Sequence, residues 1–406
     1  MLHSETHSSE GLLGLDNLLA LFDYLPQADI SRMMRVCKAL HKGGIVPLLR
    51  SGVTVKTKKR LESFCRFILA DPPTRAPHLR RFYFNITLEG DVVYGAEENT
   101  DDEDDMGSGA WPPQARKPTE GMQLLAQVLR KTKNLNDLSI DSCDVLFERC
   151  VDLMKAIIRL PNLHRLQCAG VGIRTLVLID QIKSRLVEID VHCYDEELDM
   201  LGLPWIDPLL GKASIAPHHT TLEKLSAWYV HLRDTTTTQY PSMRALALRS
   251  FRGLDTAFLR RVFPNLRYLE LSAMSAPDNS ADPLRTANQQ HHESWDALEH
   301  ICGCLSALYA LGLQRAMKRV DVDYVSSLDC TLRQLRTLVA DTSPSRLLVH
   351  TGYYVCQKFE VAKLPELLAI PEASKITHLV LDMSLKYLDG NGAALIVSAD
   401  FAFRTF

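Results

Sequence analysis

A hexamer with apolar residues at its first, fourth and sixth positions recurs along the chain from residue 79 onward. The first residues of the nine clear copies are Leu79, Leu135, Leu163, Leu186, Leu222, Met243, Leu266, Met317 and Ile376. A weaker copy lies near Leu347–Val349. Because side chains alternate between the two faces of a strand, the fourth and sixth positions share one face. Each copy therefore predicts a short strand that is buried on one side.

Between the hexamers, apolar residues recur at spacings of three and four, which is typical of amphipathic helices. The four clearest apolar faces lie within 124–129, 151–158, 258–262 and 298–308. A proline stands two residues before several hexamers, at Pro77, Pro161, Pro241 and Pro264. Proline is a helix breaker, so it favours the end of a helix just before an extended segment. The repeating unit is predicted to be one strand and one helix.

The shorter spacings between copies are 21, 23, 23 and 28 residues. They fall inside the period of about 20–29 residues of leucine-rich repeats. One strand and one helix cannot bury their apolar faces alone, whereas stacked copies form a continuous core. We therefore expect an α/β fold over 53–406, an irregular leucine-rich-repeat solenoid with parallel strands on the concave side and helices outside. The longer spacings of 56, 51 and 59 residues are assigned to an acidic insert, a polar loop at about 276–294, and the weaker copy.

The third and fifth positions of each hexamer are predicted to point out of the sheet on the concave face. We expect this face to bind a target protein through Arg165, Gln167, Glu188, Asp190, Lys224, Tyr268, Glu270, Arg319 and Asp321. A surface of mixed charge that includes a tyrosine suits a protein partner better than a nucleic acid. For any one of these residues, the alternative is a solvated side chain without a partner.

An insert at about 89–119 interrupts the repeats. Residues 97–105 hold seven Asp and Glu in nine positions, and glycines and prolines flank them. Carboxylates that repel one another cannot form a core, so the insert is predicted to be a loop. The favoured interpretation is a solvated excursion between repeats, and the other is a docking strip for a basic partner.

The N-terminal region precedes the repeats. Residues 1–11 are polar and are predicted to be disordered, whereas 12–52 form a compact helical unit. Two apolar helix faces are present, at Leu18–Leu25 and Ile30–Leu40, and Pro26 separates them. Asp16 is placed to cap the first helix. A helical hairpin is therefore expected ahead of the first repeat.

Three motifs of this hairpin resemble an F-box. Tyr24-Leu25-Pro26 and Val36-Cys37 match the Tyr-Leu-Pro turn and the Val-Cys helix end of that family. Leu13-Gly14-Leu15-Asp16 stands where the family has Leu-Pro-x-Glu, so Gly14 replaces the proline. The segments 61–73 and 308–313 look like the F-box and leucine-rich proteins that are abundant in mushroom-forming fungi.

The resemblance implies a substrate-recognition adaptor of an SCF-type ubiquitin ligase. The F-box would dock on a Skp-family adaptor, and through it on a cullin-based ligase, while the solenoid would hold the target. Carried over residue by residue, the adaptor-binding positions are Leu13, Leu25, Pro26, Ile30, Met33, Val36 and Cys37. Several large apolar side chains together can anchor a partner. The alternative is that these residues pack only the hairpin, which then caps the first repeat.

Composition narrows the classes of function. Hydrophobic residues make up 46% and charged residues 23%, as in ordinary folded proteins. The net charge of -3 and the pI near 6.5 exclude binding of nucleic acids or membranes through an overall positive charge. The start of the chain lacks the pattern of a secretory signal, and no apolar run approaches the ~18 residues of a membrane span. The ten cysteines are scattered, which is typical of a reduced compartment. We expect an intracellular protein, cytoplasmic or nuclear.

No enzymatic motif was found. The chain lacks G-x-x-x-x-G-K-[ST], G-x-G-x-x-G, G-x-S-x-G and H-E-x-x-H, and its Cys and His residues lack the paired spacing of a zinc site. We therefore expect neither catalysis nor a metal or cofactor. The first alternative to the adaptor is a leucine-rich binding scaffold with no ubiquitin-ligase link. The second is a hydrolase, which would show perturbed Asp, His or Ser residues gathered in one pocket.

Overall fold

The computed structural model describes residues 14–85, 119–193, 215–232, 237–274, 281–290, 295–323, 328–351, 369–385 and 395–402. The expected disordered start at 1–11, the position Leu13 and nearly all of the acidic insert lie outside these residues. The chain divides into two compact units. Unit 1 comprises 1–165 and 182–184, and unit 2 comprises 166–181 and 185–406.

Unit 1 begins with three helices, α1 (Leu15–Leu21), α2 (Gln27–Met33) and α3 (Lys38–Ser51), and a 3-10 turn at Phe22–Tyr24. Pro26 precedes α2, and the Cys37 side chain accepts a hydrogen bond from the Leu40 amide at the start of α3. Gly52 ends α3 with a φ of 105°, a conformation that favours glycine. Phe22, Ile30, Met34 and Leu40 form the buried cluster between these helices.

The rest of unit 1 alternates strands and helices. Its elements are β1 (Val53–Val55), α4 (Lys58–Ala70), α5 (Pro72–Arg75), β2 (Arg81–Phe84), α6 (Glu120–Lys131), β3 (Asp137–Ile140), α7 (Cys143–Arg149) and α8 (Val151–Ile158). Strand β2 pairs in parallel with both β1 and β3. Strand β4 (Arg165–Ala169) follows at the boundary of the two units.

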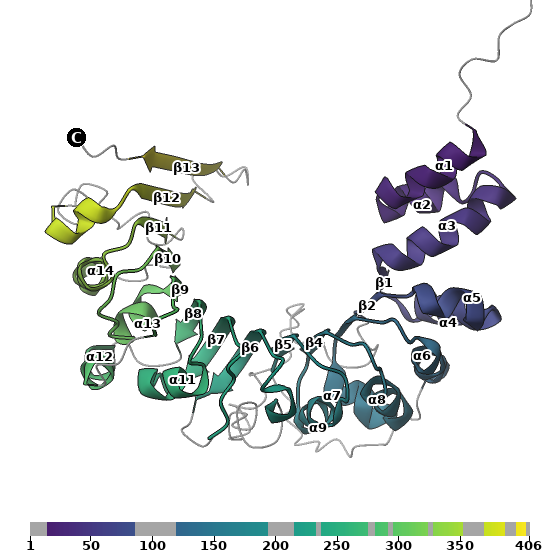
Figure 1. The fold of residues 1–406 in the computed structure, drawn as a ribbon, viewed down its shortest axis with the longest axis horizontal. Coiled ribbons are helices and arrows are strands. Elements are labelled where there is room, and N and C mark those ends of the chain that lie inside the picture. The colour runs from purple at the N-terminus through teal and green to yellow at the C-terminus, as the bar shows by residue number, and fades with distance from the viewer. Residues whose placement is uncertain are drawn as a thin grey trace, which may run out of the picture. The chain divides into compact units, whose positions relative to one another are not determined.

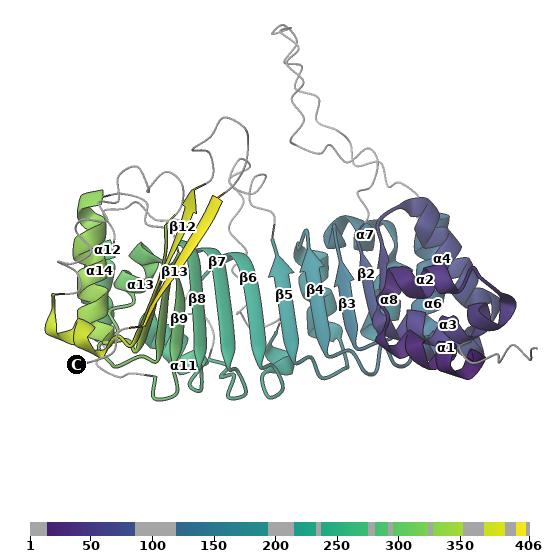
Figure 2. The ribbon, with the colours of Figure 1, turned by 90° about the horizontal axis from the view of Figure 1, so that it is seen from above.

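Unit 2 continues the alternation, with its strands in chain order (Figures 1 and 2). Its strands are β5 (Glu188–His192), β6 (Lys224–His231), β7 (Ala245–Arg252), β8 (Tyr268–Met274), β9 (His300–Cys304), β10 (Arg319–Asp323), β11 (Arg346–Thr351), β12 (His378–Leu385) and β13 (Leu395–Ala402). Its helices are α9 (Ile173–Gln181), α11 (Thr256–Val262), α12 (Ala281–Gln289), α13 (Leu305–Ala310) and α14 (Leu328–Thr342). From β5 to β12 each strand pairs in parallel with the next, and β13 pairs antiparallel with β12. The α/β class with a parallel sheet is confirmed, and this arrangement is compatible with a solenoid.

The hexamer pattern correctly predicts which side of the sheet is buried. The fourth-position residues of β5 to β12 align across the sheet and are at most 2% exposed: Ile189, Leu225, Leu246, Leu269, Ile301, Val320, Leu347 and Leu379. Figure 1 shows the helices of unit 2 on one side of its strands. Burial of each such side chain stabilises the fold by about 1.5–3 kcal/mol.

The expected helix at 298–308 is wrong in its first half. Residues 300–304 form strand β9, and α13 begins only at Leu305. This copy of the hexamer has Leu298 and Ile301 in the first and fourth positions but Gly303 in the sixth. Gly303 has a φ of 140°, and a Cβ there would clash with the carbonyl of Leu271 on β8. Because the backbones of β8 and β9 approach closely here, only glycine fits at the sixth position, where the other copies have a side chain that marks the pattern.

The polar loop expected at about 276–294 contains helix α12, so that prediction is wrong for 281–289. Its polar residues are partly buried, because they hydrogen-bond to neighbouring backbone. Asn288 donates from Nδ2 to the Ala310 carbonyl at 2.7 Å and accepts from the Thr256 amide at 3.0 Å. Arg285 donates to the Tyr309 carbonyl at 3.1 Å. A pattern search for apolar residues cannot detect a helix whose inner face is polar.

Side-chain amides also connect successive repeats. The residue directly before the hexamer is an asparagine in several copies, and its Nδ2 donates to a carbonyl of the preceding repeat. The bonds are Asn134 to Pro77 at 2.8 Å, Asn162 to Lys133 at 2.9 Å and Asn265 to Pro241 at 2.9 Å. These bonds satisfy turn carbonyls that no strand or helix pairs.

Candidate binding surfaces

The first candidate surface is the face of the unit 2 sheet opposite its helices, which we call the polar face. It consists of the side chains at the third, fifth and seventh hexamer positions of strands β5 to β10. Three in-register rows result, because neighbouring strands pair without a shift. A contact on one strand can therefore extend to the same position of the next.

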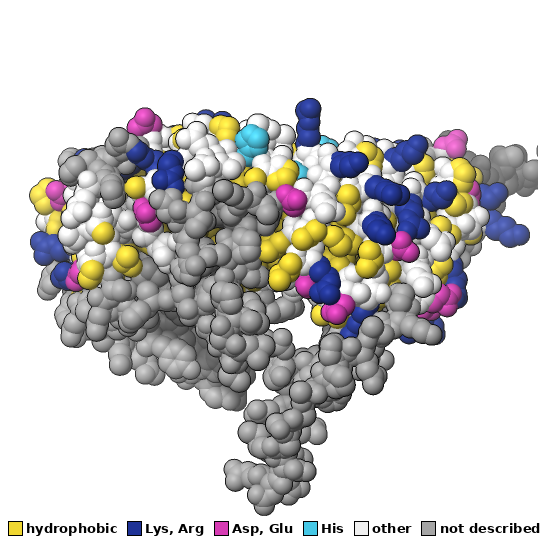
Figure 3. Space-filling view, turned by 90° about the horizontal axis from the view of Figure 1, so that it is seen from below, with side chains coloured by type: hydrophobic (Ala, Val, Ile, Leu, Met, Phe, Trp, Pro, Cys, Tyr) yellow, Lys and Arg dark blue, Asp and Glu magenta, His cyan; other side chains and the backbone are white. Residues whose placement is uncertain are grey.

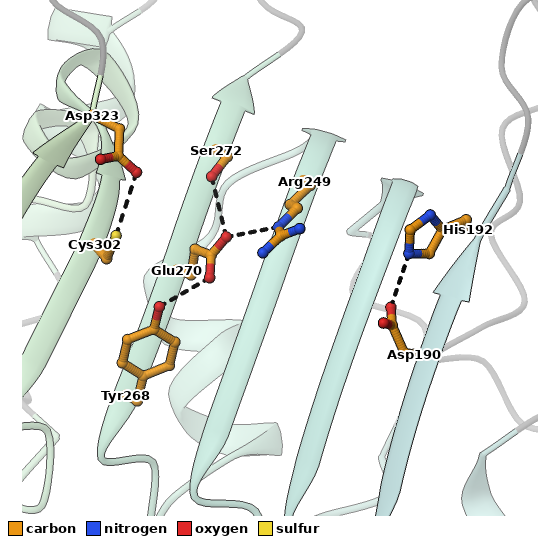
Figure 4. Close-up of polar contacts among 8 residues, drawn as sticks. All are labelled: Asp190, His192, Arg249, Tyr268, Glu270, Ser272, Cys302 and Asp323. Atoms are coloured by element: carbon orange, nitrogen blue, oxygen red, sulfur yellow. Dashed lines mark hydrogen bonds and ion pairs between the residues drawn. The ribbon is translucent and has the colours of Figure 1, made fainter. Parts of the chain in front are cut away.

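Glu270 is the centre of the polar face (Figure 4). Its carboxylate accepts from the Tyr268 hydroxyl at 2.9 Å, from Arg249 Nε at 2.7 Å and from Ser272 Oγ at 3.4 Å. The hydrogen bond between Arg249 and this carboxylate is the main cause that raises the pKa of the Arg249 guanidinium, and the negative charge of Glu270 adds to it. These bonds hold the arginine and the tyrosine in fixed orientations on β7 and β8.

Planar side chains stack on β5 to β7. The His192 ring lies on the Trp228 ring with centroids 4.9 Å apart, and the Arg249 guanidinium carbon lies 5.2 Å from the Trp228 centroid. His192 Nε2 is 3.1 Å from Asp190 Oδ1. Burial opposes ionisation of Asp190, but hydrogen bonds from His192 and Ser226 hold its pKa below the ordinary range. Asp190 is therefore charged at neutral pH and orients the histidine.

A second carboxylate cluster lies on β9 and β10. Asp321 is only 6% exposed and contacts His300 Nε2 at 2.9 Å and Arg319 Nε at 2.8 Å. Burial opposes its ionisation, but these two neighbours hold its pKa below the usual range. Cys302 donates from Sγ to Asp323 at 3.5 Å (Figure 4). Burial, and then the nearby Asp323, raise the pKa of the Cys302 thiol to about 12.

The chemistry of the polar face is that of binding groups. The Cys302 thiol is protonated at neutral pH because its pKa is raised. The pKa of the Tyr268 hydroxyl is raised mainly by burial, and to a smaller extent by the neighbouring Cys302 and Glu270. Both therefore offer hydrogen bonds instead of nucleophilic anions. Fixed aromatic rings and a guanidinium supply contact area at a small entropic cost. Within the part of the chain that the structure describes, no group of three or more His, Cys, Asp or Glu side chains could hold a metal ion.

The structure places most of the predicted target-binding residues on the polar face. Glu188, Asp190, Lys224, Tyr268, Glu270, Arg319 and Asp321 lie there at the third and fifth positions of their strands. Arg165 and Gln167 lie on β4, where Arg165 is exposed and Gln167 is partly exposed.

Eight contributing residues were missed by sequence analysis: His192, Ser226, Trp228, Arg249, Ser272, His300, Cys302 and Asp323. Five of them occupy the seventh position, one residue beyond the six-residue pattern: His192, Trp228, Arg249, Ser272 and Asp323. His300 and Cys302 belong to β9, the copy hidden by its glycine. Extending each hexamer by one residue would have found the five at the seventh position.

The second candidate surface lies on the helices α1 to α3 of unit 1. Of the predicted adaptor-binding residues, Pro26, Val36 and Cys37 are exposed, with Val36 at 74%. Ile30 is 1% exposed, and Leu25 and Met33 pack against the same cluster. The expectation that Ile30 contacts a partner is therefore corrected, since its side chain lies in the core between α1, α2 and α3.

Other apolar side chains of these helices are exposed. They are Leu15 at 46%, Leu21 at 40% and Tyr24 at 85%. Leu15 and Leu21 begin and end α1, and Tyr24 closes the turn before Pro26. The same three helices thus have a closed internal cluster and additional apolar side chains in solvent.

Neither known protein families nor curated proteins gave a match to this sequence. Among the described residues, no helix is both long enough and apolar enough to cross a membrane. The structure therefore defines the class only as an α/β protein with parallel strands in chain order and a helical N-terminal segment.

Proposed function

We propose that this chain is a substrate-recognition adaptor of an SCF-type ubiquitin ligase. In this proposal α1 to α3 form an F-box that binds a Skp-family adaptor and, through it, a cullin-based ligase. The repeats form a leucine-rich-repeat solenoid whose polar face binds the target protein. The chain itself performs no catalysis and needs no cofactor.

One observation carries the proposal: Leu15, Leu21, Tyr24 and Val36 are exposed although the same helical segment encloses its own apolar cluster. Single exposed apolar residues are common, but a gathering of them on one small helical segment favours a protein partner. Removal of one such side chain from water stabilises a complex by about 1.5–3 kcal/mol. The resemblance of Tyr24-Leu25-Pro26 and Val36-Cys37 to F-box motifs names the class of that partner.

The polar face supports the second half of the proposal. Its rigid His192–Trp228–Arg249 stack and the oriented Tyr268 are the residue types enriched at the centres of protein interfaces. Its charges are largely compensated within the face, so specificity would depend on geometry more than on net charge. This combination favours a folded or extended protein segment as the target.

The test is co-expression of the full chain with a Skp-family adaptor, followed by affinity capture. We expect Tyr24→Ala and Val36→Asp to reduce capture by about tenfold or more each, as loss of one buried apolar contact corresponds to ~1.4 kcal/mol or more. Val151→Asp is the matched control, because Val151 is also an exposed valine of unit 1, at 54%, but lies on α8. Ile30 is unsuitable for such a test, since charging a core residue would unfold the hairpin.

Failure of the wild-type chain to be captured would contradict the proposal. It would favour the alternative function, a leucine-rich binding scaffold whose hairpin is a structural cap. The observation behind that alternative is that Leu25, Ile30 and Met33 pack internally. Equal loss of capture in the Val151→Asp variant would likewise argue against a specific surface on α1 to α3.

A further inference from the structure

The described part of unit 1 has a strongly cationic surface. Figure 3 shows Lys and Arg side chains gathered at the right of the view. The described residues of unit 1 hold 21 Lys and Arg against 11 Asp and Glu, a net charge of +10. The complete chain has a net charge of only -3, so the positive charge of these residues is balanced elsewhere in the sequence.

The most unusual part of this surface is the start of α4, which we call the cationic turn. It consists of Lys56, Lys58, Lys59 and Arg60, all of which are exposed. The first turn of α4 contains no acidic residue, although the partial positive charge of a helix N-terminus favours acids there. Among the described residues none of these four side chains makes an ion pair. Local structure therefore does not explain four cations at this place.

Cations elsewhere in unit 1 have an ordinary structural reason. Arg130 and Lys131 lie in the last turn of α6, where the helix dipole favours positive charge, and Arg130 also pairs with Asp152 at 3.1 Å. Arg66, further along α4, pairs with Glu120 at 2.8 Å. The cationic turn differs because it opposes the dipole, and in the described structure Glu62, the nearest acid along α4, forms no ion pair with it.

Both ends of one chain segment meet the described structure beside the cationic turn. At the first end, the Asn85 amide donates to the Val55 carbonyl at 3.0 Å, next to Lys56. At the second end, Glu120 pairs with Arg66 of α4, and a Cβ on Gly121 would lie 3.1 Å from Leu61. Between these ends the sequence runs through the seven carboxylates of Glu97–Asp105.

The chain is long enough for these charges to meet. Residues 86–96 separate Asn85 from Glu97. Eleven residues can span at most about 40 Å. The cationic turn begins at Lys56, directly after Val55, whose carbonyl accepts the hydrogen bond from Asn85. A tether of this length gives a local concentration on the order of millimolar, which makes even a weak ionic contact populated.

We propose that the cationic turn is the docking site of this chain's own acidic run, Glu97–Asp105. In this contact the carboxylates of the run pair with Lys56, Lys58, Lys59 and Arg60. The contact is ionic and exposed, so it weakens as salt shortens the Debye length from about 10 Å at 0.1 M to about 3 Å at 1 M. It is independent of adaptor and target binding.

The test measures binding of a fluorescent peptide with the sequence of residues 95–107 to full-length chains at low salt. The first chain is wild type, the second has the seven acids of 97–105 replaced by Asn and Gln, and the third adds Lys58→Gln, Lys59→Gln and Arg60→Gln. We expect the second chain to bind the peptide at least about tenfold more tightly than the wild type, whose own run competes. The third chain should lose this gain.

The control is a fourth chain with the neutralised run and Lys131→Gln, Lys133→Gln and Lys155→Gln, which has the same net charge as the third. These residues are exposed cations of unit 1 outside the turn, so this chain should bind like the second. Equal peptide binding by the wild type and the second chain would overturn the proposal, as would loss of binding in the control. All four chains are compared only after matching circular dichroism spectra and melting temperatures.

Discussion

At the scale of single residues, the structure shows two positions whose identity depends on distant neighbours. Gly303 is required because the backbone of β9 approaches that of β8, and its φ of 140° lies where L side chains are strained. His218 is 3% exposed, and its Nε2 donates to the carbonyl of Ile179 at 3.0 Å, so it is buried as a neutral ring. Each position leads to a stability prediction.

Gly303→Ala is expected to lower the free energy of unfolding by about 3 kcal/mol or more, because the new Cβ clashes with the Leu271 carbonyl. Denaturant unfolding measures this change. Gly14→Ala is the control, since a Cβ at Gly14 has no neighbour within 4 Å and its φ is -59°. Equal stability of both variants would show that β8 and β9 are not as close as described.

Removal of His218 is expected to flatten the pH dependence of stability. Burial lowers the pKa of His218 in the folded chain. Below about pH 6.5 the unfolded chain therefore binds a proton that the folded chain excludes, and stability falls as pH falls, by up to about 1.4 kcal/mol per pH unit. His218→Gln should lose this part of the slope between pH 7 and 5. The exposed neighbour His219, changed to Gln, serves as the control, and an unchanged slope in His218→Gln would contradict the burial of the ring.

At the scale of elements, polar bonds supplement the apolar stack. Asparagines before three of the hexamers connect their turns to the preceding repeat, and Asn288 connects α12 to the start of α11 and the end of α13. Such bonds specify which neighbour each element meets, whereas apolar burial alone is not directional. They explain how α12 is held although its inner face includes Arg285 and Asn288.

Asn265→Ala is expected to destabilise the chain by about 1 kcal/mol, because the Pro241 carbonyl loses its side-chain donor. Thermal unfolding should show a lower melting temperature, and hydrogen exchange should show faster exchange near residues 240–245. Asn17→Ala, at an exposed position of α1, should change neither. Equal effects of the two substitutions would argue that the asparagine bonds contribute nothing specific.

At the scale of the whole molecule, the two candidate surfaces belong to different units. The exposed apolar residues lie on α1 to α3 of unit 1, and the aromatic and charged network lies on β5 to β10 of unit 2. In repeat proteins each element contacts mainly its neighbours, so a surface substitution has local effects. Binding at the two surfaces should therefore be separable.

If the proposed adaptor function holds, Trp228→Ala with Tyr268→Ala is expected to abolish capture of target proteins and to leave capture by a Skp-family adaptor unchanged. Val36→Asp should have the reverse effect. Quantitative affinity capture of both partners from the same cells measures this. Loss of both partners in either variant, with folding intact, would show that the surfaces do not act independently.

Much of the fold was predictable because one rule, burial of the first, fourth and sixth hexamer positions, repeats along the chain. That rule correctly predicted β2 to β8, β10 and β12, and placed Asp190, Tyr268, Glu270 and Asp321 on the polar face. It failed at β9, because Gly303 is set by the close approach of the β8 backbone. It failed at α12, because Asn288 hydrogen-bonds to the Ala310 carbonyl instead of packing as an apolar residue.

The amino-acid sequence alone determined the alternation of strands and helices, since apolar periodicity is a local property. The tertiary structure decided which side chains are exposed and can contact a partner. Ile30 and Cys37 lie on the same predicted apolar helix face, yet Ile30 is 1% exposed and buried, whereas Cys37 is exposed. The stack of His192, Trp228 and Arg249 likewise exists only once three strands pair in register. Exposure and side-chain pairing depend on which elements meet, and that is set by packing across the fold.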